Sequence, residues 1–242
     1  MKLLIIRHGD PNYEIDSLTP VGWEEAELLA DRLEKLDVKA FYVSPLGRAK
    51  DTAAATLKRK GAEARVLDWL REFPAKVLKP GAERTGIAWD WLPQDWMKIP
   101  AFFDKDAWCH EEVFEKADVP ALVQRVYEGL DTLLASHGYI REGNRYRAEC
   151  ANEDTIVLVC HFGLECVLLS HLLNISPMIL WHNACAAPTS VTTLTTEERR
   201  EGVVVFRMNS FGDVSHLYAG SREPSFSARF CETYHNTKQR HD

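Results

Sequence analysis

Two short apolar runs, each ending in a histidine, constrain the fold of this chain more than any other feature. Residues 2–6 lead into Arg7 and His8, and residues 155–160 lead into His161. Apolar runs of this length, bounded by polar residues, are typical of strands that are buried on both faces of a parallel sheet. Each strand would carry its histidine to the edge of the sheet, where the pattern predicts a pocket for phosphate.

The rest of the chain alternates between strand and helix signals. Strands are expected at residues 2–7, 40–44, 64–70 and 155–161, and an antiparallel pair at 189–196 and 202–208. Helices are expected from Thr19-Pro20 onward, from Ser44-Pro45 to about Lys60, and over roughly 118–137 and 163–174. Alternation of this kind is typical of a mostly parallel sheet covered by helices on both faces. We therefore predict a three-layer α/β/α fold with a mostly parallel central sheet.

Residues 74–120 interrupt this alternation with four tryptophans and five prolines. We interpret them as an aromatic-rich insertion folded over the main body, either as a small accessory core or as a surface for a partner. Residues 221–242 are polar and lack periodicity, so a loosely ordered tail is expected there. The predicted organisation is a single domain over 1–220, with the insertion at about 74–120, followed by this tail.

Composition excludes several classes of function. The net charge is −7 and no basic block is present, which argues against a nucleic-acid surface. No apolar run approaches the length of a membrane span. The six cysteines form neither a CxxC pair nor a regular framework, which favours a reducing cytoplasm. We expect a small phosphorylated substrate as the partner, with no nucleic acid and no membrane, and leave the oligomeric state open, a homodimer included.

The ends of the predicted strands supply polar side chains that suit phosphate chemistry. Ser44 and Arg48 follow the second strand, and Glu72 follows the third. Ligands of such sheets bind beyond the carboxyl ends of the strands. Arg48 would lie in the first turn of a helix, where free N–H groups also attract anions. The histidines lack metal-ligand spacing with cysteines or carboxylates, so neither a metal nor another cofactor is predicted.

Five segments occur in a fixed order along the chain. They are Arg7-His8-Gly9, Leu18-Thr19-Pro20-x-Gly22, the stretch 44–52 with Ser44, Arg48 and Thr52, Leu70-Arg71-Glu72, and Cys160-His161-Phe162-Gly163. Together they resemble the histidine phosphatase superfamily, which contains the cofactor-dependent phosphoglycerate mutases and many phosphatases. The resemblance covers residues 1–72 and about 120–210, and it implies a phosphoglycerate mutase-like fold.

The resemblance also implies three catalytic residues. His8 would be the nucleophile that forms a phosphohistidine, and His161 would be the second histidine of the pocket. Glu72 would give a proton to the leaving oxygen and then activate water, although Asp68, Glu83 or another acid of the insertion could serve instead. Because Glu72 must be protonated in the first step, we expect the rate to fall on the alkaline side.

Four further residues would bind the substrate. Arg7 and Arg48 would clamp the phosphoryl oxygens, which guanidinium groups bind bidentately. Gly9 would let the backbone approach the phosphate closely. Asn12 would touch the phosphate, although Asp10-Pro11-Asn12 replaces the Glu-Thr run that is commoner in the family.

The resulting hypothesis is a metal-independent phosphomonoester hydrolase. A phosphoglycerate mutase-type phosphotransferase is the main alternative, but it would need further cationic contacts, and residues 74–120 contain no tight cationic cluster. A catalytically silent binding module that uses residues 74–120 is a third possibility, against which the intact Arg7, His8, Arg48 and His161 argue. The substrate stays open among sugar phosphates, nucleotides, phosphorylated protein histidines and small organic phosphates.

Overall fold

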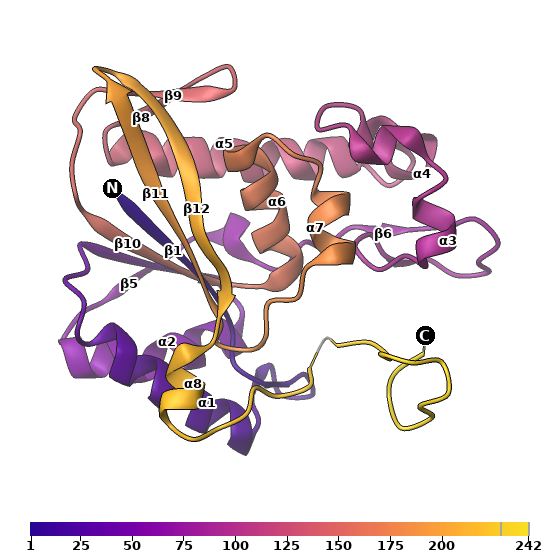
Figure 1. Cartoon of the computed structure of the whole chain (residues 1–242), viewed down its shortest axis with the longest axis horizontal. Helices are drawn as coiled ribbons and strands as arrows, with labels where there is room; N and C mark the ends of the chain where they lie inside the picture. Colours follow the sequence, from indigo (N-terminus) through magenta and orange to yellow (C-terminus); the bar gives the residue numbers. More distant parts are fainter. Residues whose placement is uncertain (228, 242) are drawn as a thin grey trace.

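A computed structural model describes residues 1–227 and 229–241, and in these residues the main sheet has eight strands. Their order across the sheet is β5-β4-β10-β1-β11-β12-β9-β8 (Figure 1). The bounds are β1 (Lys2–Arg7), β4 (Ala40–Val43), β5 (Ala64–Val66), β8 (Tyr139–Glu142), β9 (Arg145–Ala148), β10 (Thr155–Cys160), β11 (Val191–Arg200) and β12 (Val203–Asp213).

The sheet is parallel on one side and antiparallel on the other. β1, β10, β4 and β5 run parallel to one another, whereas β11 and β12 form a long hairpin in which β11 pairs antiparallel with β1. The hairpin is the antiparallel pair predicted from the sequence, and β9 and β8 extend it at the sheet edge. The predicted α/β class is confirmed, and the complete sheet is mixed because the hairpin belongs to it.

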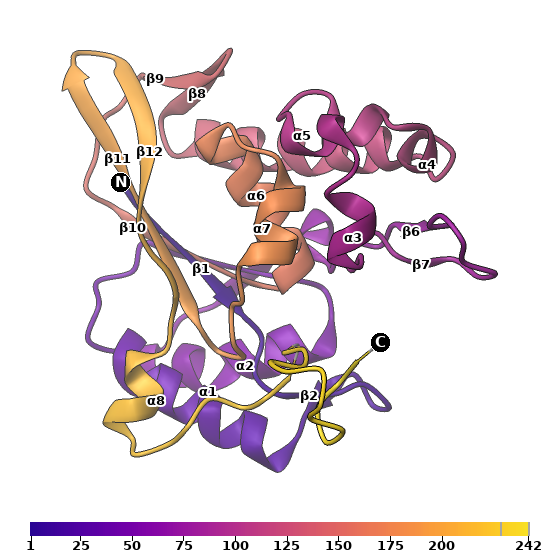
Figure 2. The same ribbon diagram turned by 45° about the vertical axis from the view of Figure 1, so that its right-hand side comes forward.

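Helices cover both faces of the sheet (Figures 1 and 2). α1 (Pro20–Leu33) and α2 (Gly47–Lys60) lie on one face together with the short α8 (Ser215–Ala219). α5 (Val119–Ser136) and α6 (Phe162–Leu173) lie on the other, and α7 (Pro177–Asn183) packs on α6. None of the helices in the described part of the chain is long and apolar enough to cross a membrane.

Each face of the sheet has its own core because side chains alternate along a strand. Leu4 and Ile6 of β1 pack toward α1 and α2. Leu3 and Ile5 point the other way and join the larger core under α5 and α6. β1 is therefore buried on both sides, as its continuous apolar run predicts.

Residues 74–120 form a compact layer against α5 and α7. They contain β6 (Lys76–Val77), β7 (Gly86–Ile87), α3 (Pro93–Trp96), α4 (Glu112–Glu115) and two short 3-10 turns. Trp91, Trp96 and Trp108 are buried in the same cluster as the core of α6. The aromatic residues thus build an accessory core, the simpler of the two interpretations of this segment.

Several predicted boundaries need correction. The strand expected at 64–70 ends at Val66, and a 3-10 turn follows at Asp68–Leu70. The helix expected from Ser44-Pro45 begins at Gly47, and its N-cap Leu46 makes no side-chain bond. The Ser44 hydroxyl bonds His161 at 2.7 Å and accepts the Leu46 N–H at 3.3 Å. Sequence reasoning also missed β8, β9, α7 and α8, whose short or charged segments carry little periodicity.

The C-terminal segment has no helix or strand in its described residues beyond 220, yet it is tied to the body at several points. Arg222 pairs with Glu24 of α1, and Ser227 donates to the carboxylate of Asp10. Arg240 pairs with Asp90 of the insertion at 3.0 Å. The tail therefore links the start of the chain to the insertion, as Figure 2 allows the reader to follow.

We predict that Gly22→Ala destabilises the fold by about 1–3 kcal/mol, as overpacking does. A Cβ at Gly22 would lie 2.3 Å from the carbonyl oxygen of Asp10, which is backbone and cannot swing aside. Urea unfolding measures the change. Gly86→Ala is the control, because its Cβ would meet only the end of the Lys79 side chain at 3.5 Å. Equal stability of the two variants would contradict the prediction.

Candidate active site

The two histidines predicted from the strand ends lie side by side. β1 and β10 pair in parallel with Arg7 opposite Cys160, so the next residues, His8 and His161, come level with each other. Their rings are 5.0 Å apart between centroids, and both side chains are buried. The register of two strands thus creates the centre of the site.

The tautomer of His8 is set by the backbone. Its Nδ1 lies 2.7 Å from the carbonyl oxygen of Gly9, to which it donates, and this leaves Nε2 with a lone pair. Burial, followed by the positive charge of Arg7, lowers the pKa of His8 well below its usual range. His8 is therefore neutral near pH 7, the state in which Nε2 can act as a nucleophile.

His161 is held by the residue that follows β4. Its Nε2 lies 2.7 Å from the hydroxyl of Ser44, and its Nδ1 is buried without a hydrogen-bond partner. Burial, then the nearby His8, Arg48 and Arg7, lower the pKa of His161 well below its ordinary value. A bound anion would offset these positive charges and favour the protonated ring.

Arg7 and Arg48 line the same space, and each is anchored through one nitrogen. Arg7 donates from NH1 to the carbonyl oxygen of Ala186 at 2.6 Å, and Arg48 pairs through NH1 with Asp16 at 2.6 Å. The Nε of each arginine is buried and has no hydrogen-bond partner. Since buried donors are normally satisfied, these two N–H groups indicate a site built for an anion.

Asp16 fixes Arg48 in the first turn of α2. Its second carboxylate oxygen accepts the Gly47 N–H at 2.7 Å, and the ring of Tyr13 lies 5.4 Å from the Arg48 guanidinium. Burial raises the pKa of Asp16, but the Gly47 N–H and Arg48 outweigh it and leave the pKa lowered. Asp16 therefore stays ionised and holds one fork of Arg48, while the rest of the guanidinium can face the pocket.

Glu72 reaches the start of α6. Its Oε1 accepts the N–H groups of Phe73 at 2.8 Å and Leu164 at 3.0 Å. Burial raises the pKa of Glu72, and these N–H groups and Arg7 only partly oppose it. A carboxyl with a raised pKa at the start of the helix that follows His161 is suited to proton transfer. The alternatives lie elsewhere: Asp68 is exposed and pairs with arginines, and Glu83 is exposed.

Gly9 and Asn12, the other two residues predicted to bind phosphate, make different contacts. The N–H of Gly9 donates to the hydroxyl of Thr52 at 2.9 Å, and a Cβ at Gly9 would lie 2.9 Å from the Gly22 carbonyl oxygen. Asn12 lies on β2 (Pro11–Asn12), where its side-chain oxygen accepts the Glu14 N–H at 3.1 Å. Its predicted contact with phosphate stays a prediction.

Sequence reasoning missed three supports of the site. Asp16 has no signal in its loop, the sequence places Ser44 only at the end of a strand, and it places Thr52 only within the segment 44–52. Thr52 follows Arg48 by one helical turn, and this spacing could have placed it beside the pocket. Two further histidines have structural contacts outside the site: His171 bonds Asp131, and His182 accepts the Trp91 N–H.

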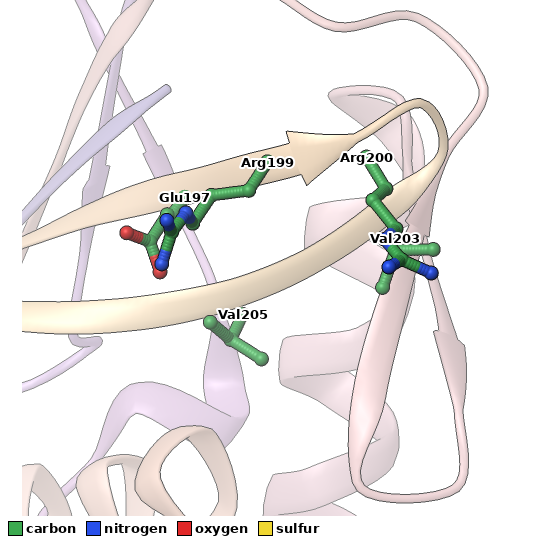
Figure 3. Close-up of a pocket in the computed structure, with 5 residues that line it drawn as sticks. All are labelled: Glu197, Arg199, Arg200, Val203 and Val205. Carbon is green, nitrogen blue, oxygen red and sulfur yellow. The ribbon is translucent and has the colours of Figure 1, made fainter.

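A hollow at the far end of the β11–β12 hairpin does not belong to this site. It has a volume of about 450 Å³ and is lined by Glu197, Arg199, Arg200, Val203 and Val205 at the tip of the β11–β12 hairpin (Figure 3). Thr195 pairs with Lys2 at the start of β1, so the hollow lies beyond the end of β1 that is opposite to His8. No group of three or more metal-binding side chains occurs among residues 1–227 and 229–241.

Comparison with known proteins agrees with this geometry. Residues 3–209 match the family described as histidine phosphatase superfamily (branch 1), and the chain belongs to this superfamily. No curated protein matches its sequence.

Three solved structures of the same fold have low sequence identity to this chain. A mycobacterial glucosyl-3-phosphoglycerate phosphatase is 22% identical with a TM-score of 0.58, covering 87% of this chain and 98% of that one. A phosphoserine phosphatase from Entamoeba histolytica, in complex with 3-phosphoglyceric acid, is 19% identical with a TM-score of 0.57, covering 89% and 98%. YhfR from Bacillus stearothermophilus is 21% identical with a TM-score of 0.58, covering 89% and 98%.

We expect Arg48→Gln to raise the pKa of His161, because one of the charges that lower it is removed. An NMR titration of the imidazole protons would measure the shift. Arg59→Gln is the matched control, since Arg59 lies on the same helix but pairs with surface carboxylates of α1 and the residue that follows it. If both variants left the His161 pKa unchanged, Arg48 would not face this histidine.

Proposed function

We propose that the protein is a metal-independent phosphomonoester hydrolase that works through a phosphohistidine on His8. The observation that carries the proposal is the convergence of a neutral, oriented His8 with three buried nitrogens that lack partners: Arg7 Nε, Arg48 Nε and His161 Nδ1. Phosphoryl transfer depends on such prearranged donors around the transferred group. The phosphatases of the same fold support a hydrolase.

In the first step, Nε2 of His8 attacks phosphorus and the bond from phosphorus to the ester oxygen breaks. Glu72 gives its proton to that oxygen, and the alcohol leaves. Arg7 and Arg48 hold the phosphoryl oxygens, and a protonated His161 donates to them. Gly9 gives the phosphate room, and Asn12 would reach it from β2.

In the second step, water attacks the phosphohistidine. The Glu72 carboxylate takes the proton of the water, the bond between phosphorus and Nε2 breaks, and inorganic phosphate is released. Dividing the displacement into two steps lowers the barrier of each. No metal or other cofactor is needed in either step, because fixed cations stabilise the charge on the oxygens.

The charges of the insertion favour hydrolysis over mutase activity. A mutase must also bind a second anionic group, which needs further cations near the pocket. In residues 74–120, Lys76, Arg84 and Lys98 are exposed, Lys105 and Lys116 pair with neighbouring carboxylates, and the half-buried Lys79 lies over the ring of Trp91 at 5.8 Å. The intact Arg7, His8, Arg48 and His161 likewise disfavour a silent binding module.

We predict that His8→Ala lowers the rate of phosphate release by at least about a thousandfold. The assay offers a panel of phosphomonoesters with a chelator present and detects inorganic phosphate. The wild type should also retain acid-labile phosphate on His8 after rapid quenching. If the chelator stopped phosphate release by the wild type, the proposed metal independence would be wrong. If phosphate were transferred to a second substrate without release, the protein would be a mutase.

For Glu72→Gln, we expect kcat/KM, which reports on the first step alone, to fall by roughly 10²–10⁴ with alkyl phosphates, because the leaving alkoxide loses its proton donor. The loss should be much smaller with p-nitrophenyl phosphate, whose leaving group needs no proton. Since the protonated carboxyl is active and its pKa is raised, the wild-type rate should fall as the pH rises through that pKa. An equal loss with both esters, or a flat profile to pH 9, would exclude this role.

A further inference from the structure

We propose that Trp89 is a substrate-binding residue whose indole N–H donates a hydrogen bond to an oxygen of the leaving group. The protein would then select phosphate esters that carry a carboxylate or hydroxyl oxygen near the ester bond. The inference rests on the proposed function, because it places the leaving group beside Glu72.

The first observation is the position of the indole nitrogen. A Cβ at Gly163 would lie 2.6 Å from Nε1 of Trp89 and 2.7 Å from Oε1 of Glu72, so both atoms border the same small space above α6. Gly163 is two residues beyond His161. The insertion thus places a polar nitrogen next to the expected proton donor.

The second observation is that this nitrogen has no partner. Trp89 Nε1 is buried and makes no hydrogen bond to any described residue. The neighbouring Oε1 of Glu72 is already occupied by the N–H groups of Phe73 and Leu164. An unsatisfied buried donor costs free energy, so its retention beside the site favours a role in binding an acceptor.

The third observation is that Trp89 is held rigidly. Its ring meets Phe162 edge-on at 6.2 Å between centroids. On either side of it, the Ala88 N–H donates to Ala75 at 3.0 Å and the Trp91 N–H to His182 at 3.0 Å. Preorganised donors of this kind bind a ligand without a further ordering cost.

The donor has a definite preference among leaving groups. An N–H needs an oxygen acceptor, and a carboxylate is the strongest acceptor because the hydrogen bond is charge-assisted. An ester whose leaving alcohol has no second oxygen would leave the indole N–H unpaired in the complex. The unpaired donor weakens the binding of such an ester. The proposed selectivity follows from this difference.

The test compares Trp89→Phe with Trp96→Phe on two pairs of esters. Phosphoserine and phosphoethanolamine differ by a carboxylate, and 2-hydroxyethyl phosphate and ethyl phosphate differ by a hydroxyl. Trp96 is the matched control, because its Nε1 is also buried and unpaired but its ring stacks on His182 in the accessory core. Circular dichroism would verify that both variants fold.

We expect the wild type to prefer the oxygen-bearing member of at least one pair. Trp89→Phe should lower kcat/KM for that member by about tenfold or more, mainly through KM. The kcat/KM for the other ester of the pair should fall much less. Trp96→Phe should keep the preference. The pair that responds identifies the acceptor as carboxylate or hydroxyl.

Three results would overturn the inference: no preference in the wild type, a preference that survives Trp89→Phe, or an equal loss in Trp96→Phe. Cleavage of p-nitrophenyl phosphate distinguishes these failures from a failure of the proposed function. If the wild type cleaves that ester but shows no preference, only the role of Trp89 is wrong. If it cleaves none of the esters, the hydrolase itself is wrong.

Discussion

The parallel pairing of β1 with β10 is the constraint on which the rest of the site depends. The pairing sets Arg7 opposite Cys160, and the N–H of His8 continues it by donating to the Cys160 carbonyl oxygen at 3.0 Å. His8 and His161 are then neighbours because each is the first residue beyond its strand. A shift by one residue would turn alternate side chains to the opposite face and separate the rings. The two cores that bury both faces of β1 oppose such a shift, so ordinary apolar packing also sets the geometry of the proposed active site.

The pocket concentrates positive charge in a buried space, and few carboxylates offset it. Asp16 engages one fork of Arg48 and stays ionised. Glu165 of α6 is buried nearby, but burial raises its pKa to about 7, against the opposing effects of Thr192 and Arg7. At neutral pH this carboxyl is therefore only partly ionised and only partly offsets the charge of Arg7. The pocket keeps an excess of cationic donors, which adds to burial in lowering the pKa of both histidines and favours a bound anion.

Much of this arrangement could be predicted because strand ends and helix starts leave clear signals. The apolar runs before His8 and His161 predicted both strands, and the segment 44–60 predicted Arg48 in the first turn of a helix. Contacts between distant segments left no such signal: nothing local shows that Asp16 would hold Arg48 or that Ser44 would bond His161. The third strand was predicted too long, because Asp68–Leu70 is apolar enough to resemble a strand yet forms a turn. The division into one domain over 1–220 and a tail over 221–242 stays a prediction, and so do the roles of all the site residues, Asn12 included.

The insertion matters to the chemistry because it follows Glu72 directly in the chain. Phe73, the next residue, packs against Trp181 at 5.7 Å between ring centroids, and the Trp181 indole donates to the Gly163 carbonyl oxygen at 2.9 Å. The start of α6 is thereby joined to the start of the insertion, with the Glu72 carboxyl between them. The accessory core then has a purpose beyond burial: it fixes the backbone on the far side of Glu72 and brings Trp89 back to the same helix end. A carboxyl placed by a loop alone would be free to move, whereas Glu72, the proposed proton donor, is held from both directions.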